Sequence, residues 1–340
     1  MLSLSIVDQS PVPAGMSATE ALKATVDLAR AAEALGYRRY WLAEHHNTSS
    51  LAGTAPEVLA AVVGSATSTI RVGSGGVLLP YYSPLKVAET FRTLQALFPG
   101  RIDLGVGRAA GADATTEAAL LASGGASGEE RFPEHLADLC GLVSGNDDAN
   151  GGVFAGARAM PEGPGGPEVW LLGSSSYSSA CAAHLGLSFA FAHFITPFWG
   201  PQIVASYRRG FRPGLVPAPR VVVAVAALCA DTDEDARRQA STADLWHLGP
   251  EGAGRPPILP PEVVAAHPWT GLERARAAQR RAKVFVGTPD RVHADLLGVA
   301  GEFEADELAI VTVCHDLRAR RRSYELLAAA FDLGGSTPLG

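Results

Sequence analysis

Short runs of β-branched and apolar residues alternate along this chain with longer runs rich in alanine, leucine and arginine. Such alternation is typical of consecutive strand and helix units that build a parallel sheet. Eight main strands are expected: Leu2–Val7, Tyr37–Ala43, Ile70–Leu79, Arg101–Val106, Glu168–Leu172, Leu187–Phe191, Arg220–Cys229 and Glu307–Val313. Lys283–Val286 is predicted to form a short extra strand.

The helical runs carry local signals for their ends. The run Ala18–Leu35 follows Ser17, which with Thr19 is a candidate cap, and it stops at Gly36. A proline in the first turn begins the run Pro84–Phe98, as helix geometry favours. Further helices are expected over Pro56–Ser68, Arg131–Val143 and Leu317–Phe331.

The order of these elements predicts an α/β fold, a (β/α)8 TIM barrel, with residues 1–340 as one domain. Its insertions follow strands, and mobile loops are expected at 109–128, 146–166 and 249–261, the second with a short strand at Val153–Phe154. The first could also be a loose helix. An open doubly wound sheet is the alternative, but Gly105, Gly107 and Gly111 are spaced one residue too far for the GxGxxG fingerprint. The closed barrel is favoured.

Composition narrows the classes of function. A net charge of −7 argues against broad attraction to nucleic acid or to an anionic membrane surface. The chain lacks an apolar run of the ~18 residues that a membrane span needs, and its first residues do not resemble a signal peptide. Its four cysteines occur singly, so neither a disulfide framework nor a metal site is expected. These features favour a cytoplasmic protein that acts on small molecules.

Candidate chemical groups follow the predicted strands, at the end of a barrel that carries active sites. The second strand leads into Glu44-His45-His46, although one of two such histidines is often only structural. Gly75 and Gly76 interrupt the third strand, either as a kinked corner or as a place where a ligand lies against the backbone.

Two further segments could hold a phosphate. Arg108 ends the fourth strand, as a phosphate clamp or as a plain surface charge. The run from Ser174 to Ser178 precedes a helix, where backbone N–H groups and hydroxyls could cradle an anion, although serines also cap helices routinely. Tyr177 stands where a GxSxG hydrolase motif needs glycine, so a serine hydrolase is poorly supported.

Taken in order, the segments AEHHN, RVGSGGVLLP, SPLKVAE and GRIDLGVGR resemble the bacterial-luciferase-like flavin monooxygenase family. The segment DELAIVTVCHDLRARRRSYELLAAAF is similar to the end of that family. The resemblance extends from LSIVDQSP to Phe331 and is weakest across residues 146–166 and 249–261. Members bind FMN, or in a related branch the deazaflavin F420, at the barrel mouth.

The resemblance implies roles for individual residues. His45 matches the catalytic histidine of the family and Glu44 its buried neighbour. The remaining implied positions bind the flavin: Gly75 and Gly76 against the ring, in the family often through a cis peptide, Arg108, Ser174, Ser175 and Ser178 on the phosphate, and His193 beside the ring. Gly107 replaces a cysteine of bacterial luciferase, which puts a thiol-dependent step and light emission in doubt.

Several aromatic residues are expected near the cavity, where they would suit a flat aromatic substrate, although ordinary core or loop positions explain them equally well. They are Tyr81, Tyr82, Phe194, Phe198 and Trp199. The arginine-rich, alanine-rich composition suggests a high-GC genome and, with it, an aromatic natural-product intermediate as substrate.

The implied function is a two-component monooxygenase that takes reduced FMN from a separate NAD(P)H:flavin reductase and uses O2. His45 would act as acid and base, with the pKa near 6.5 that is usual for histidine. A homodimer is expected by analogy with relatives. An F420-dependent hydride-transfer enzyme and a non-catalytic flavin-binding protein are the alternatives.

Overall fold

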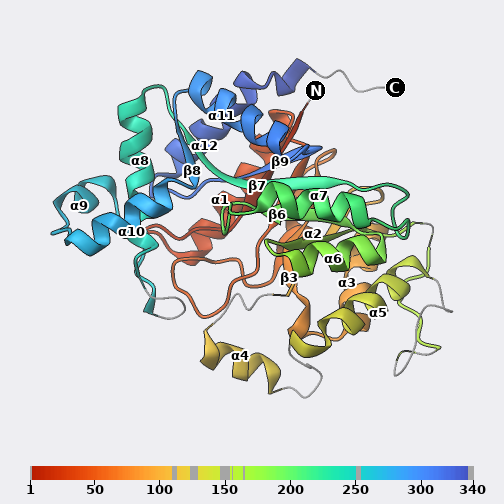
Figure 1. Ribbon diagram of the computed structural model, residues 1–340. Coiled ribbons are helices and arrows are strands. Elements are labelled where there is room, and N and C mark those ends of the chain that lie inside the picture. Colours follow the sequence, from red (N-terminus) through yellow and green to blue (C-terminus); the bar gives the residue numbers. More distant parts are fainter. Residues whose placement is uncertain are drawn as a thin grey trace.

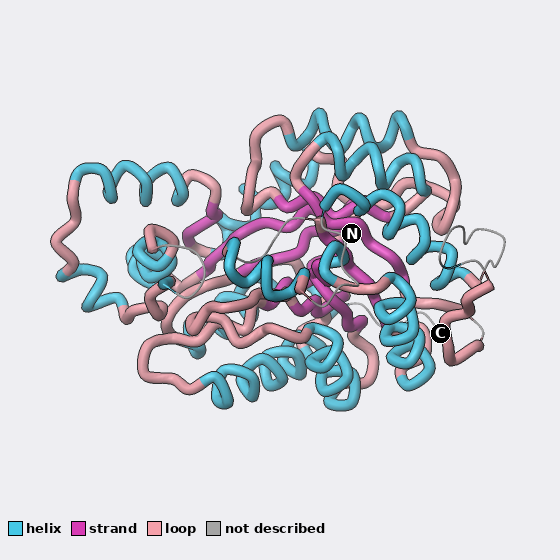
Figure 2. The backbone as a smooth tube through the Cα atoms, turned by 90° about the horizontal axis from the view of Figure 1, so that it is seen from below, coloured by secondary structure: helices cyan, strands magenta, loops and turns pink. Residues whose placement is uncertain are grey.

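The computed structural model describes residues 2–108, 113–122, 129–145, 154, 156–163, 165–249 and 254–335. Strands occupy the centre of the molecule and helices surround them (Figures 1 and 2). Among the helices of these residues, none has both the length and the apolar character to cross a membrane.

Eight parallel strands close into a barrel, which confirms the predicted fold class. Each strand pairs with the next in the order β1-β2-β3-β4-β5-β6-β7-β9, and β9 returns to β1. The predicted extra strand is also present as β8, which pairs with the carboxyl half of β7 outside the closed barrel. The strands are β1 Ser3–Asp8, β2 Arg39–Leu42, β3 Arg71–Leu78, β4 Ile102–Gly107, β5 Glu168–Gly173, β6 Ser188–Ala192, β7 Val221–Cys229, β8 Val284–Gly287 and β9 Glu307–Val311.

Helices cover the outside of the barrel (Figure 2). Ser17 caps α1 through a capping box, so the first of its two candidate caps is confirmed. The helices are α1 Ala18–Ala34, α2 Pro56–Ala66, α3 Pro84–Leu97, α4 Ala114–Leu121, α5 Phe132–Ser144, α6 Ser176–Leu185, α7 Gly200–Gly210, α8 Asp233–Trp246, α9 Pro261–Ala266, α10 Gly271–Arg281, α11 Pro289–Glu302 and α12 Leu317–Ala330.

Parts of the three expected loops lie among the described residues. Residues 114–121, inside the first of them, form α4, so the loose-helix alternative describes that stretch. In the second, Phe154 is not in a strand, and Val153 lies outside the described residues. In the third, Ile258 is buried and pairs with Pro13 through an isolated bridge.

Side chains inside the barrel form a polar layer below an apolar one. At the amino ends of the strands, the fully buried Arg39 forms ion pairs with Asp103, Glu168 and Glu307. Above it an apolar cluster fills the interior: Val7, Trp41, Trp170, Ala190, Val222, Ala224, Ala309 and Val311. The interior is therefore packed, and the carboxyl ends of the strands are left to form a site.

The third strand changes direction at its two glycines. The β3–β4 register shifts between Ser74 and Val77, and the Gly75–Gly76 peptide is cis, as the resemblance implied. A Cβ atom on Gly76 would lie 2.8 Å from the carbonyl oxygen of Gly105. Only glycine fits this close approach between neighbouring strands.

Candidate active site

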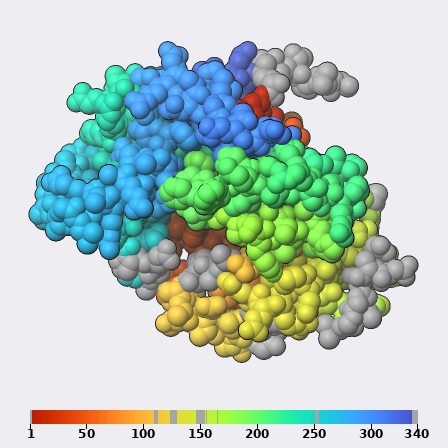
Figure 3. Space-filling model, in the orientation of Figure 1, coloured from red at the N-terminus to blue at the C-terminus, as the bar shows by residue number. Residues whose placement is uncertain are grey.

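A cavity of about 470 Å³ lies at the carboxyl ends of β7 and β9, beside the segment that follows β2. We call it the mouth cavity. Figure 3 shows a hollow on this face of the molecule, with blue and green segments along its border and red segments at its floor. Residues that line it include Gln9, His45, His46, Leu51, Phe194, Ala226, Asp244, His247, Arg255, Arg280, Arg281, Val311 and Val313.

His45 brings its imidazole ring into this cavity. Its backbone N–H donates to the Gly53 carbonyl over 2.8 Å, which fixes the segment after β2. Among the described residues, its buried Nδ1 atom has no hydrogen-bond partner. Burial, with smaller contributions from Arg255 and His46, lowers the pKa of His45 to about 4.

This pKa corrects the value near 6.5 expected from the sequence. At neutral pH the His45 ring is uncharged, because desolvation in the folded protein disfavours the imidazolium. The neutral ring keeps one N–H and can accept a second proton on its other nitrogen. Its charge state therefore permits a general base, and a pKa of about 4 makes the unliganded ring a weak one.

Glu44 ties three segments together just behind His45. Its carboxylate is buried and accepts hydrogen bonds from the Leu78 backbone N–H over 2.9 Å and from the Tyr82 hydroxyl over 2.6 Å. Nε2 of His46 lies 2.8 Å from the same carboxylate. Glu44 thus fixes the end of β2 against the end of β3, where the cis peptide lies, and its contacts are those of a positioning residue.

The residues expected to hold a phosphate come together at the start of α6. Ser175 caps this helix and forms a reciprocal capping box with Ser178. The Arg108 guanidinium lies 4.6 Å from the ring centre of Tyr177, so the end of β4 meets this segment. Arg108 also has Glu129 at 3.8 Å, a distance typical of a loose surface ion pair.

The expected aromatic residues have different surroundings. Phe194 lines the mouth cavity, and Tyr82 contacts Glu44 as described. Tyr81 is buried behind β3, with a pKa raised to about 12 chiefly by burial. Trp199 is 75% exposed and Phe198 is 62% exposed, and neither is part of the cavity wall.

His193 lies away from the cavity, in the layer between strands and helices. Its ring stacks on Phe285 with centres 5.7 Å apart and meets the edge of Phe303 at 5.8 Å. Burial lowers its pKa to about 4. The contact with a flavin ring that the resemblance implied for His193 stays a prediction.

The sequence reasoning missed the cationic wall of the cavity. Arg255, Arg280 and Arg281 come from the insertion after β7, on the loop before α9 and the end of α10, and His247 follows α8. Their signal in the sequence is weak, because arginines on an amphipathic helix usually face solvent. Only the return of α10 toward the barrel brings them to the mouth.

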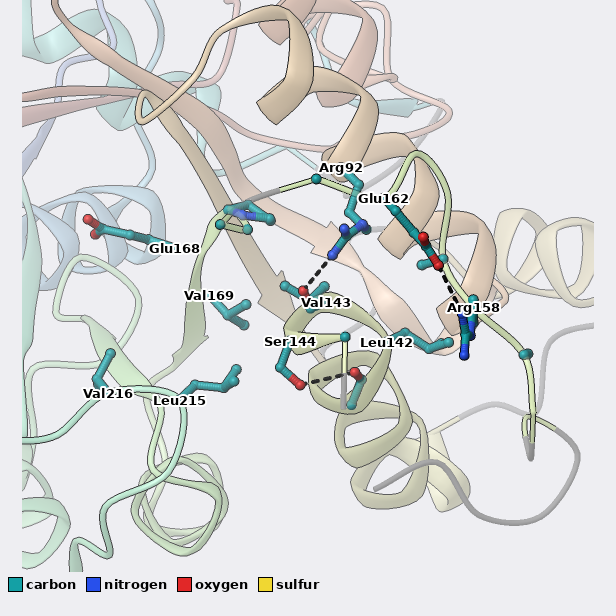
Figure 4. Close-up of a pocket in the computed structure, with 18 residues that line it drawn as sticks. Arg92, Leu142, Val143, Ser144, Arg158, Glu162, Glu168, Val169, Leu215 and Val216 are labelled. Carbon is teal, nitrogen blue, oxygen red and sulfur yellow. Dashed lines mark hydrogen bonds and ion pairs between the residues drawn. The ribbon is translucent and has the colours of Figure 1, made fainter. Parts of the chain in front are cut away.

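A larger cavity, of about 630 Å³, lies at the amino end of β5, the end of the barrel opposite to the mouth cavity (Figure 4). Its polar groups are already paired: Arg92 donates to the Val143 carbonyl over 3.0 Å, and Arg158 faces Glu162 at 3.3 Å. Glu168, at its rim, belongs to the ion pairs of Arg39. Active sites of barrels form at the carboxyl ends of strands, so this cavity is not our candidate.

The mouth has room and donors for a flavin. A Cβ atom on Gly107 would meet nothing within 4 Å, so β4 ends beside open space next to the Arg108–Ser175 group. The unpartnered Nδ1 of His45 offers a polar contact on the other side of the mouth. These features fit a long ligand with an anionic end and a polar ring. Among the described residues, no cluster suited to a metal ion is found.

Known proteins are similar to this chain over most of its length. The model of the family described as luciferase-like monooxygenase matches residues 2–303. A luciferase-like monooxygenase of Escherichia coli K12 is 39% identical, over 96% of each chain. The N-acetyl-S-alkylcysteine monooxygenase of Bacillus subtilis is 35% identical, over 97% of this chain and 98% of that one.

Solved structures have the same fold. Apo-MsnO8 is 41% identical and superposes with a TM-score of 0.87, over 98% of this chain and 99% of that one. An F420-dependent secondary alcohol dehydrogenase, at 12% identity and a TM-score of 0.69, covers 98% of this chain and 99% of its own. The second likeness extends to the fold alone.

Proposed function

The chain belongs to the luciferase-like monooxygenase family, and on that premise we propose that it is a two-component, FMN-dependent monooxygenase. Reduced FMN would come from a separate NAD(P)H:flavin reductase, and O2 and a small organic molecule would be the substrates. The observation that carries this proposal is the buried His45 imidazole in the mouth cavity, whose Nδ1 has no hydrogen-bond partner among the described residues. An aromatic natural-product intermediate is our first candidate for the substrate.

Different residues of the site would bind the phosphate and the ring of the flavin. Arg108 and the hydroxyls and N–H groups of Ser174, Ser175 and Ser178 would hold the phosphate, because a helix amino end and a guanidinium both favour an anion. Gly75 and Gly76 would let the flavin ring lie against the backbone of β3. Bound reduced flavin would supply the electrons that activate O2.

His45 would take a proton from the substrate or from a water molecule, since its ring is neutral at the working pH. Glu44 would hold the His45 segment in place through Tyr82 and the β3 backbone. The apolar wall of the mouth cavity would exclude bulk water from the reaction.

A binding titration tests the cofactor first. The purified chain would be titrated anaerobically with FMN, riboflavin and F420, each oxidised and reduced. We expect reduced FMN to bind most tightly. Arg108→Gln should weaken FMN binding by roughly 10- to 100-fold and leave riboflavin binding unchanged, because a charge-assisted contact to phosphate contributes about 1.5–3 kcal/mol.

Arg131→Gln is the matched control for this titration, because Arg131 is exposed and, in the part of the chain that the structure describes, forms its ion pair with Glu134 of its own helical turn. A preference for F420 would assign hydride transfer instead. Binding of flavin without O2 consumption, in the presence of NADH, a flavin reductase and a panel of substrates, would favour a flavin-binding protein. A single peak of twice the chain mass in light scattering would support the homodimer we expect.

A further inference from the structure

The mouth cavity has one strongly cationic wall. Three guanidinium groups line it, those of Arg255, Arg280 and Arg281. Arg281 is neutralised, because its Nε lies 3.2 Å from one oxygen of Asp244 and its Nη2 bonds the other. Asp244 hydrogen-bonds Arg281 directly, and its charge also acts on Arg280, where it raises the pKa.

Arg280 faces a neutral partner. Its Nη2 atom contacts Nε2 of His247, and among the described residues no carboxylate lies within ion-pair distance of it. Burial keeps the pKa of His247 well below its usual range, so this imidazole is uncharged and serves as an acceptor. Burial and the nearby Arg255 lower the pKa of Arg280 to about 10, which still leaves it protonated at neutral pH.

Arg255 lies on the same wall as Arg280. Arg255, which lies 4.6 Å from the ring centre of Trp246, is the largest electrostatic influence on His45. A partly buried cation beside a neutral acceptor is costly in free energy unless an anion joins it. The cavity therefore has the electrostatics of an anion site.

The rest of the wall is apolar. Leu51, Phe194, Val284, Val311 and Val313 line the cavity between the arginines and His45. A ligand that fits both walls has an apolar body and one anionic end.

The expected phosphate cradle lies elsewhere on the mouth. Arg108 and α6 follow β4 and β5, whereas the mouth cavity lies above β7 and β9. In the closed strand order, β4 and β5 are separated from β9 by β3, β2 and β1 on one side and by β6 and β7 on the other. One anion cannot occupy both places. If the flavin phosphate binds at Arg108 and α6, the anion at the cationic wall is a second negative group.

We propose that the mouth cavity binds an organic anion, a carboxylate or sulfonate on an apolar skeleton, with its charge on Arg280 and its body directed toward His45. The part of this inference that makes the anion the substrate rests on the proposed monooxygenase function. The anion site itself follows from the side chains alone, and it can be tested without turnover.

Two isosteric probes isolate the charge. Binding of 2-naphthoate and of neutral 2-naphthamide would be measured by calorimetry on the full chain, with and without saturating FMN. We expect wild type to bind the naphthoate at least about 10-fold more tightly than the amide. Arg280→Gln should reduce that preference to about twofold or less while the amide affinity stays the same, and Arg280→Lys should keep part of it.

Arg276→Gln is the matched control, since Arg276 lies one turn earlier on α10 and is exposed. The proposal fails if wild type shows no preference, if Arg280→Gln retains it, or if Arg276→Gln loses it equally. It also fails if Arg280→Gln weakens FMN and riboflavin as much as the naphthoate, because the arginine would then serve the flavin. Absence of flavin binding in wild type would remove the monooxygenase proposal and leave the anion preference as a separate result.

Discussion

The Tyr82 hydroxyl donates a 2.6 Å hydrogen bond to the buried carboxylate of Glu44. This bond joins the segment after β3 to the segment after β2, so it connects the two strands that carry the glycine step and His45. The burial of Tyr82 and the Glu44 charge raise the pKa of this phenol, which keeps its proton on the donor oxygen. The contact therefore holds the candidate site in one arrangement.

Removing that donor should destabilise the fold measurably. Tyr82→Phe leaves a buried carboxylate with one donor fewer, and we expect the free energy of unfolding to fall by about 1–3 kcal/mol. Urea denaturation measures the change. Tyr81→Phe is the matched control, because no hydrogen bond of the Tyr81 hydroxyl is found among the described residues and its loss should cost less than about 0.5 kcal/mol. Equal losses in the two variants would contradict the role of the Glu44 contact.

The buried ion-pair layer should be far more sensitive than the surface beside it. Arg39→Met leaves three carboxylates without their shared cation, and we expect a loss of roughly 3–5 kcal/mol in unfolding free energy. Arg38→Met removes a neighbour that is 48% exposed and 3.4 Å from Glu307, so its cost should stay below about 1 kcal/mol. Thermal and urea denaturation of both variants would reveal the contrast, and similar losses would show that the layer is not a stabilising centre.

His45 should affect turnover much more than binding. Once a substrate is found, His45→Ala should lower kcat by roughly 10²–10⁴-fold and leave the Kd for FMN within about twofold. Because burial lowers the pKa of His45 to about 4, the acid limb of kcat/KM due to this residue should fall near that pH and not near 6.5. Normal turnover in the variant would exclude a proton-transfer role.

Histidine burial should also set the acid stability of the protein. The folded pKa of His193 is about 4, below the ~6.5 of an unfolded chain, so between these values the unfolded state binds more protons. The contribution of His193 is complete above pH 6.5 and is lost as the pH falls toward 4. His193→Gln should flatten the slope of unfolding free energy against pH in this window by up to about 1.4 kcal/mol per pH unit. Equal slopes in variant and wild type would show that another group is responsible.

The barrel and much of the mouth follow from local sequence. Alternation of short β-rich and long helical runs predicted all eight barrel strands and the extra strand. The barrel strands are mostly buried and are bounded by helix signals that act locally. The ordered motifs also identified the family, and glycine at positions 75 and 76 indicated the step that the structure forms in β3.

The cationic wall and the charge state of His45 were decided only by tertiary structure. Arg280 and His247 are separated by 33 positions in the chain and meet because α10 returns toward α8, a long-range contact that no local pattern encodes. The sequence determines that residue 45 carries an imidazole, but the pKa of that imidazole depends on how completely the surrounding segments exclude water from it. Residue types and spacing therefore determined the fold and the place of the site, whereas desolvation and distant packing decided its electrostatics.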